Sequence, residues 1–190
     1  MKKTTLKNGM TLLVEKRSAK SVTIQVMVRA GSNYENEKIA GISHFIEHMM
    51  FEGTKNRTTI EIANAIESLG GEINAATSNE RTLYYITVLK KYFDIAVDVL
   101  ADMMQNPLFD EKAIEKERGV VLDEANMVID DPKRYQWVLF MKQLFKNHPA
   151  KNPIYGTPEA IKTITRKDIV DYYEKYYKPN NMIISIVGNV

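Results

Sequence analysis

The sequence predicts an α+β fold in which a mostly antiparallel, mixed sheet and a set of helices pack as two layers, with residues 1–190 as one module. Apolar residues make up 44% of the chain and charged residues 26%, an ordinary balance for a globular protein. Strand-like alternation dominates the early part and the end, and helical spacing dominates between them. No repeat or flexible linker divides the 190 residues, which suffice for one core.

The first strands are expected before residue 30. Asn8-Gly9 separates two short apolar runs, which predicts a hairpin with a tight primed turn. The next run alternates apolar residues with more polar ones, and this period of two predicts a strand with one buried face, which carries Val22, Ile24, Val26 and Val28. The following segment, "AGSNYENEKIAG", is typical of a loop.

The middle of the chain alternates between helical and strand patterns. Thr58 or Thr59 is a suitable cap for a helix that runs to Leu69, with Gly70 as its stop. Two further runs, "EINAATS" and "RTLYYITVL", predict a short extended segment and a strand. Helical spacing then extends from Tyr92 to Met104, and Asn106-Pro107 ends it.

The second half is mainly helical. A long helix is expected from near Asp110 to beyond Val128, with an interruption at Pro132 before helical spacing resumes in "KRYQWVLFMKQLF". The segment "NHPAKNPIYGTPEA" is rich in turn residues. Thr165 with Asp168 predicts a capping box for a helix through Tyr177, and "MIISIVGNV" is expected to form the last strand.

Charge and residue usage exclude several functions. With 26 basic and 24 acidic residues the net charge is +2, which gives no reason to expect nucleic acid or an anionic membrane as a partner. No apolar run is long enough to span a membrane and the first residues do not resemble a signal peptide, so we expect a cytoplasmic location. Because there is no cysteine, a metal site would have to use His, Asp or Glu.

The segment "HFIEHMMFEGT" holds two of the three histidines. On a helix, His44 and His48 lie one turn apart on the same face, and Glu47 lies beside them within about 100° of arc. Two imidazoles at this spacing can hold one zinc ion, and the carboxylate can activate water, as in the reversed motif H-x-x-E-H. An ordinary helix surface is the alternative, and a metal site needs a third ligand.

Candidates for that ligand lie in the long helix. His148 stands in a proline-rich turn, "HPAKNP", where a histidine more often orders a loop. One helical stripe is apolar except for Glu117 and Glu124, and it comprises Ala113, Ile114, Glu117, Val120, Val121, Glu124 and Val128. A buried carboxylate is costly unless it is paired or bound to a metal. Salt bridges to Arg81 or Arg118 are the alternative explanation, whereas Glu111, Glu115 and Asp123 are expected in solvent.

The motif His44-Phe45-Ile46-Glu47-His48, followed by the glutamates of "ERGVVLDE", resembles the pitrilysin/insulinase family of zinc peptidases, the inverzincins. Mitochondrial processing peptidases and many bacterial proteins belong to that family. The likeness covers nearly the whole chain, because "LKNGMTLLVE", "AGSNYE", "LGGEINAATSNERTLYY", "NPIYGTPEAI" and "NMIISIVGNV" are also similar to it. The resemblance implies a processing-peptidase-like metallohydrolase fold and a zinc metalloendopeptidase that hydrolyses peptide bonds with metal-activated water.

Position by position, the resemblance implies that this chain carries all the zinc ligands and the general base. His44, His48 and Glu124 would bind Zn²⁺, Glu47 would be the general base, and Glu117 would support the ligands from behind. The peptide substrate would add as a strand to the sheet edge formed by Asn74, Ala75, Ala76 and Thr77.

The resemblance also implies a partner. Family members enclose a chamber with at least two such modules, and this chain corresponds to the N-terminal one. The second module, from the same or a different chain, would add an arginine and a tyrosine, so we expect the isolated chain to cleave peptides poorly. Association of identical chains remains open.

Two other functions are alternatives. The S-ribosylhomocysteine lyases share the reversed motif, but they use a cysteine that this chain lacks. A non-catalytic, regulatory or scaffold module of a peptidase assembly is the other alternative; such members typically lose part of the His-Glu-His set, which this chain retains.

Overall fold

The computed structural model describes residues 1–190 and contains one six-stranded mixed sheet in the order β1-β2-β6-β3-β5-β4. The strands are β1 Lys2–Thr5, β2 Thr11–Lys16, β3 Ser21–Val28, β4 Glu72–Thr77, β5 Thr82–Leu89 and β6 Met182–Gly188. All neighbouring strands are antiparallel except β2 and β6, which are parallel. The predicted fold class is therefore confirmed.

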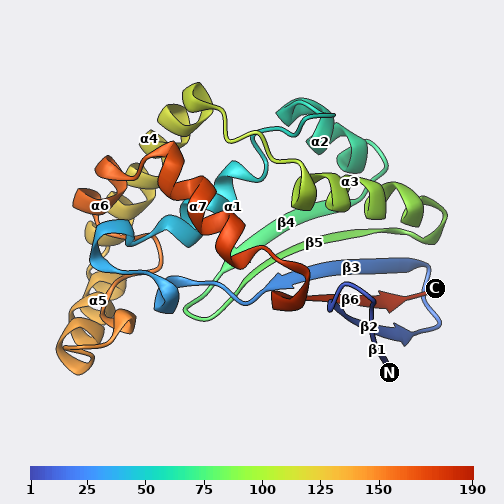
Figure 1. Cartoon of the computed structure of the whole chain (residues 1–190), viewed down its shortest axis with the longest axis horizontal. Helices are drawn as coiled ribbons and strands as arrows, with labels where there is room; N and C mark the ends of the chain where they lie inside the picture. The colour runs from blue at the N-terminus through green and yellow to red at the C-terminus, as the bar shows by residue number, and fades with distance from the viewer.

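Seven α-helices accompany the sheet: α1 Ile42–Met49, α2 Thr59–Glu67, α3 Phe93–Gln105, α4 Glu111–Ile129, α5 Pro132–Leu144, α6 Pro158–Thr163 and α7 Arg166–Tyr176. In Figure 1, α2 and α3 lie over one face of the sheet, while α1 and α4 to α7 gather at the end of the sheet remote from both termini. None of these helices combines the length and apolar character needed to cross a membrane.

The strand alternation produces the core. Val22, Ile24, Val26 and Val28 of β3 are all buried, as predicted, and they join an apolar cluster of 29 buried residues. Complete burial of such side chains contributes about 1.5–3 kcal/mol each before entropy is counted. The alternation of apolar residues in β3 therefore determines which face of the sheet is covered by helices.

Most helix ends follow the predicted signals. Thr58 and Thr165 both form capping boxes, and Asp110 caps α4 through the N–H groups of Lys112 and Ala113. Pro132 occupies the first turn of α5, where its missing N–H costs no hydrogen bond. The helix predicted to reach Leu69 ends at Glu67.

Two local predictions need correction. The hairpin around Asn8-Gly9 exists, but Thr5 pairs with Thr11, so its loop spans residues 6–10 and is not a two-residue primed turn. Gly9 adopts φ +88° and donates its N–H to Leu6 O at 2.9 Å, which closes a wider turn. The segment predicted to be rich in turns ends in the short helix α6, which Thr157 caps and which was not predicted.

Candidate metal centre

Helix α1 is positioned by the segment that precedes it. Gly41 adopts φ +96°, and a Cβ there would lie 2.7 Å from Gly156 Cα, so the two backbones pack directly against each other. The buried carboxylate of Glu35 accepts the N–H groups of Gly41 at 2.6 Å and Ser43 at 2.9 Å, which satisfies donors at the start of the helix. Burial raises the pKa of Glu35, and these two hydrogen bonds oppose that rise.

The buried face of α1 fixes the direction of the opposite face. Ile42, Ser43, Phe45, Ile46 and Met49 are buried in the core. His44 and His48 therefore face α4, with ring centroids 4.7 Å apart. The helix on which the shared face of the two histidines depended is present as α1, Ile42–Met49, and it brings both imidazoles to one side.

Three side chains converge between α1 and α4. Glu124 Oε2 lies 3.4 Å from His44 Nε2 and 3.6 Å from His48 Nε2, and the three donor atoms all lie within 4.8 Å of one another. A tetrahedral zinc ion with ligands at about 2.0–2.2 Å places neighbouring donor atoms about 3.3–3.6 Å apart. Both distances from Glu124 to the imidazole nitrogens match this geometry, so the group fits a zinc ion.

The stripe on α4 is narrower than predicted. Ile114, Glu117 and Val121 are buried, but Val120 is 39% exposed and therefore lies outside it. The side chain of Glu124 is 43% exposed, because it stands at the open end of the site. Glu111, Glu115 and Asp123 are exposed, as predicted.

Glu117 contacts His48 at Nδ1, the ring nitrogen that does not face Glu124. Its Oε2 lies 3.0 Å from His48 Nδ1, and its Oε1 lies 3.3 Å from the ammonium of Lys116. A carboxylate on Nδ1 favours the tautomer whose Nε2 lone pair points toward Glu124, as a metal ligand requires. The alternative pairing of Glu117 with Arg81 or Arg118 is wrong, since Arg118 instead binds Glu115 and two backbone carbonyls.

His44 is suited to bind a metal as a neutral ring. Burial, with a smaller contribution from His48, lowers its pKa to about 4, so the imidazole is uncharged at neutral pH. Its buried Nδ1 has no hydrogen-bond partner. The carboxyl groups of Glu47, Glu117 and Glu124 gather around the two rings, and a divalent cation would offset their negative charge.

Glu47 lies beside the ligands and contacts the sheet edge. The hydroxyl of Thr77 donates a hydrogen bond to Glu47 Oε2. Burial raises the pKa of Glu47, and the hydrogen bond from Thr77 opposes that rise. A buried carboxylate with one oxygen held in this way is the kind of group that can act as a general base.

The predicted edge strand is also at the site. β4 pairs only with β5, so one side of its backbone is free, and α1 packs against it. Within the strand Ile73, Ala75 and Thr77 are partly buried, whereas Asn74 and Ala76 are exposed. The alternation that puts Thr77 on the helix-facing side was visible in the sequence, but its contact with Glu47 was not predicted, and neither was the Glu35 cap.

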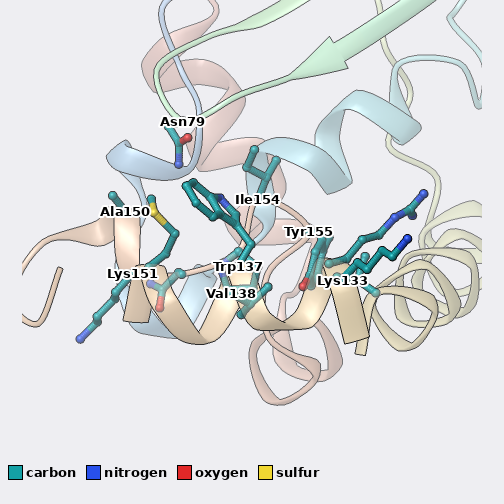
Figure 2. A pocket seen from close by; sticks show the side chains of 13 residues that line it. Asn79, Lys133, Trp137, Val138, Ala150, Lys151, Ile154 and Tyr155 are labelled. Carbon is teal, nitrogen blue, oxygen red and sulfur yellow. The ribbon is translucent and has the colours of Figure 1, made fainter. Parts of the chain in front are cut away.

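His148 has the structural role expected of it. Its Nδ1 accepts the N–H of Ala150 at 3.1 Å and caps a short 3₁₀ turn. Nearby, α5 and the segment around Ile154 enclose a cavity of about 440 Å³, which no candidate ligand lines. Figure 2 shows Trp137 extending from α5 toward Asn79 across this cavity.

Comparison with protein families gives two matches. A model described as "Insulinase (Peptidase family M16)" matches residues 10–158, and one described as "Peptidase M16 inactive domain" matches residues 163–190. The zinc protease YmxG of Bacillus subtilis is 39% identical over 100% of this chain and 47% of its own length. The beta subunit of the mitochondrial-processing peptidase of Rattus norvegicus is 38% identical over 98% of this chain and 38% of its own length.

Solved structures give the same fold. A protease from Helicobacter pylori superposes with a TM-score of 0.91 at 29% identity and covers 100% of this chain and 46% of its own. Pitrilysin superposes with a TM-score of 0.87 at 29% identity, covering 99% of this chain and 21% of its own. The chain thus spans about half the length of these relatives or less. Several of the relatives are named zinc proteases, so zinc is the metal of the family.

Proposed function

This chain belongs to the insulinase family of peptidases, family M16, and we propose that it is the metal-binding module of a zinc-dependent endopeptidase. One observation carries the proposal: the donor atoms of His44, His48 and Glu124 face a common point, and the carboxylate of Glu47 stands beside them. We also propose that residues 1–190 act together as one module, since a single apolar cluster joins the sheet to α1, α3 and α7.

Each side chain has a distinct task in the proposed reaction. Zinc, when bound, would polarise the scissile carbonyl and make water a stronger nucleophile at neutral pH. Glu47 takes the proton of the attacking water and passes it to the leaving amine nitrogen. Burial raises its pKa, which makes its carboxylate a stronger base than that of an exposed glutamate. Glu117 keeps His48 in the ligand tautomer.

The substrate in this proposal is a peptide in extended conformation. It pairs with the free side of β4 at Asn74, Ala75, Ala76 and Thr77, whose small side chains leave the backbone accessible. Backbone pairing binds a peptide without strong dependence on its side chains. The contact of Thr77 with Glu47 supports this location, because it places the strand beside the proposed base.

A second module completes the enzyme in this proposal. The relatives are about twice as long as this chain or longer, and one relative is named as a subunit of a processing peptidase. Transition-state contacts from another module normally lower a barrier by several kcal/mol. The chain by itself should therefore bind zinc but cleave peptides several orders of magnitude more slowly.

A non-catalytic role is the second candidate. Residues 163–190 match a model described as an inactive domain, which favours it. All the proposed ligands and the base, however, lie within residues 10–158, which match the peptidase model. Zinc content separates the two candidates, because a scaffold has no need of a loaded metal site.

The test is a peptide-cleavage assay on the chain alone and with a candidate second module, with and without chelator. We expect chelator-sensitive cleavage only with the second module, and a loss of about 10²- to 10⁴-fold in Glu47→Gln with zinc retained. Cleavage by Glu47→Gln at the wild-type rate would remove Glu47 from the mechanism. Strong turnover by the verified monomer would contradict the need for a second module.

A further inference from the structure

The hydroxyl of Thr77 lies between the carboxylate of Glu47 and the hydroxyl of Thr82. Thr77 and Thr82 face each other across the β4–β5 pair, and their hydroxyl oxygens are 3.4 Å apart. Thr82 Oγ1 also lies 3.0 Å from the carbonyl oxygen of Ala30, and Thr77 Oγ1 contacts Glu47 Oε2. The four groups are Ala30, Thr82, Thr77 and Glu47, and they form a row of polar atoms that leads from the carbonyl of Ala30 to the proposed base.

The number of protons fixes the direction of these hydrogen bonds. A hydroxyl has one proton to donate, and a backbone carbonyl can only accept. Thr82 is buried and gives its proton to Ala30, so its oxygen is left as an acceptor beside Thr77. Since the ionised carboxylate of Glu47 also only accepts, Thr77 donates its proton there.

The contact also distinguishes the two carboxylate oxygens of Glu47. Oε2 accepts the hydroxyl of Thr77, and the backbone N–H of Thr77 also interacts with the carboxylate, whereas no side chain donates a hydrogen bond to Oε1. A carboxylate held at one oxygen keeps its orientation, so the other can face a fixed point. Because Thr77 is part of β4, that orientation is set by the same strand to which the substrate would pair.

We propose that Thr77 is a positioning residue that holds Glu47 at Oε2, so that Oε1 receives the proton of the attacking water. Because Thr77 belongs to β4, Oε1 then keeps a fixed position relative to the peptide that pairs with this strand. This inference rests on the proposed function and adds to it the residue that connects base and substrate. The proton moves from water to Oε1 and then to the amine nitrogen as the C–N bond breaks, and the water oxygen remains on the carbonyl carbon. Thr77 keeps its own proton throughout.

A second threonine pair provides a matched control. Thr23 and Thr87 form a cross-strand hydroxyl pair at 2.9 Å on the same sheet, also partly buried. That pair contacts no carboxylate. Thr87→Val therefore removes a comparable hydroxyl from β5 without touching Glu47.

The kinetic test uses the chain assembled with its second module. Thr77→Val keeps the side-chain shape and the β4 backbone, so we expect KM to stay within about twofold while kcat falls about 10- to 100-fold, the effect of one hydrogen bond to a charged group. Thr77→Ser should restore most of kcat, and Thr87→Val should leave both constants unchanged. An unchanged kcat in Thr77→Val, or an equal loss in Thr87→Val, would overturn the proposal.

A second test needs no catalysis and separates this inference from the proposed function. Unfolding midpoints of the chelator-treated chain are measured for Thr77→Val, Glu47→Ala and the double variant. If the two side chains interact, the double variant loses less than the two single losses combined. Thr77→Val should also retain one zinc per chain. Additive losses would refute the Thr77 contact even if peptide cleavage is observed, whereas coupled losses without any cleavage would count against the proposed function alone.

Discussion

Helices α1 and α5 are both rich in apolar residues, but α1 is largely buried whereas α5 is exposed. Five of the eight residues of α1 are buried, and its polar face carries the candidate ligands. None of the thirteen residues of α5 is buried, and Trp137 and Phe140 are 61% and 51% exposed. The core of the chain therefore holds the candidate ligands of α1 in place, whereas α5 leaves large apolar side chains exposed at the surface.

The two ends of α1 explain its fixed position. Glu35 accepts N–H groups at its start. Beyond its end, Asp102 of α3 accepts hydrogen bonds from Thr54 at 2.6 Å and from Asn56 at 2.6 Å, which fixes the turn that follows. No buried polar group holds α5 in this way; Asp131 caps it, and it packs against α4 and the 3₁₀ turn at Pro149–Lys151.

The largest effect is expected at the start of α1. Glu35→Ala leaves buried N–H groups of Gly41 and Ser43 without acceptors, so we expect a loss of about 3 kcal/mol in the free energy of unfolding. Glu35→Gln should lose less, because an amide oxygen can still accept. Urea unfolding is the measurement. Lys38→Ala, at an exposed neighbouring position, should leave the midpoint unchanged, and an equal loss there would contradict the assigned role of Glu35.

The second effect concerns pH and the turn after α1. Burial by itself would raise the pKa of Asp102, but hydrogen bonds from Thr54, Asn106, Asn56 and Arg57 outweigh it and lower the pKa to about 2. Because this lies below the ordinary value of 3.8, the stabilisation is present above about pH 4 and is lost as the pH falls toward 2. The difference amounts to about 2 kcal/mol.

Unfolding midpoints between pH 6 and pH 2 measure this contribution. Asp102→Asn should be less stable than the wild type at pH 6, and the gap should narrow as the pH falls. A constant gap over that range would show that the Asp102 carboxylate does not supply the stability assigned to it.

The smallest effect on stability is expected in α5. Replacing Trp137 and Phe140 by serine should change the free energy of unfolding by less than about 1 kcal/mol, because both side chains are more than half exposed. The same variant should reduce self-association of the chain, measured by sedimentation velocity. Gln143→Ser is the control on the same helix. A large loss of stability would show that α5 belongs to the core of this chain.

Some features of these helices and of the sheet could be predicted from sequence patterns. Helical periodicity placed His44 and His48 on one face and Glu117 on a buried one, because neighbours on a helix are set by spacing alone. Strand alternation identified the buried residues of β3. These predictions concern periodic elements, in which local geometry determines direction.

Contacts between different helices and strands could not be predicted from these patterns. The Glu35 cap depends on the left-handed turn at Gly41, and the Thr77 contact depends on how α1 crosses β4. The loop at residues 6–10 and the exposure of Val120 depend on pairing register and on which neighbour covers α4. The exposure of α5 was equally hidden, since the run from Trp137 to Met141 consists of residues that are usually buried.

The zinc content of the purified chain tests the central claim most directly, because every proposed ligand lies within this sequence. We expect one zinc per chain in the wild type and in His148→Ala, which changes the one histidine outside the site. His48→Ala should contain almost none, and Glu117→Gln should bind zinc about 10- to 100-fold more weakly. Full zinc content in His48→Ala would contradict the assignment of His44, His48 and Glu124 as the metal site.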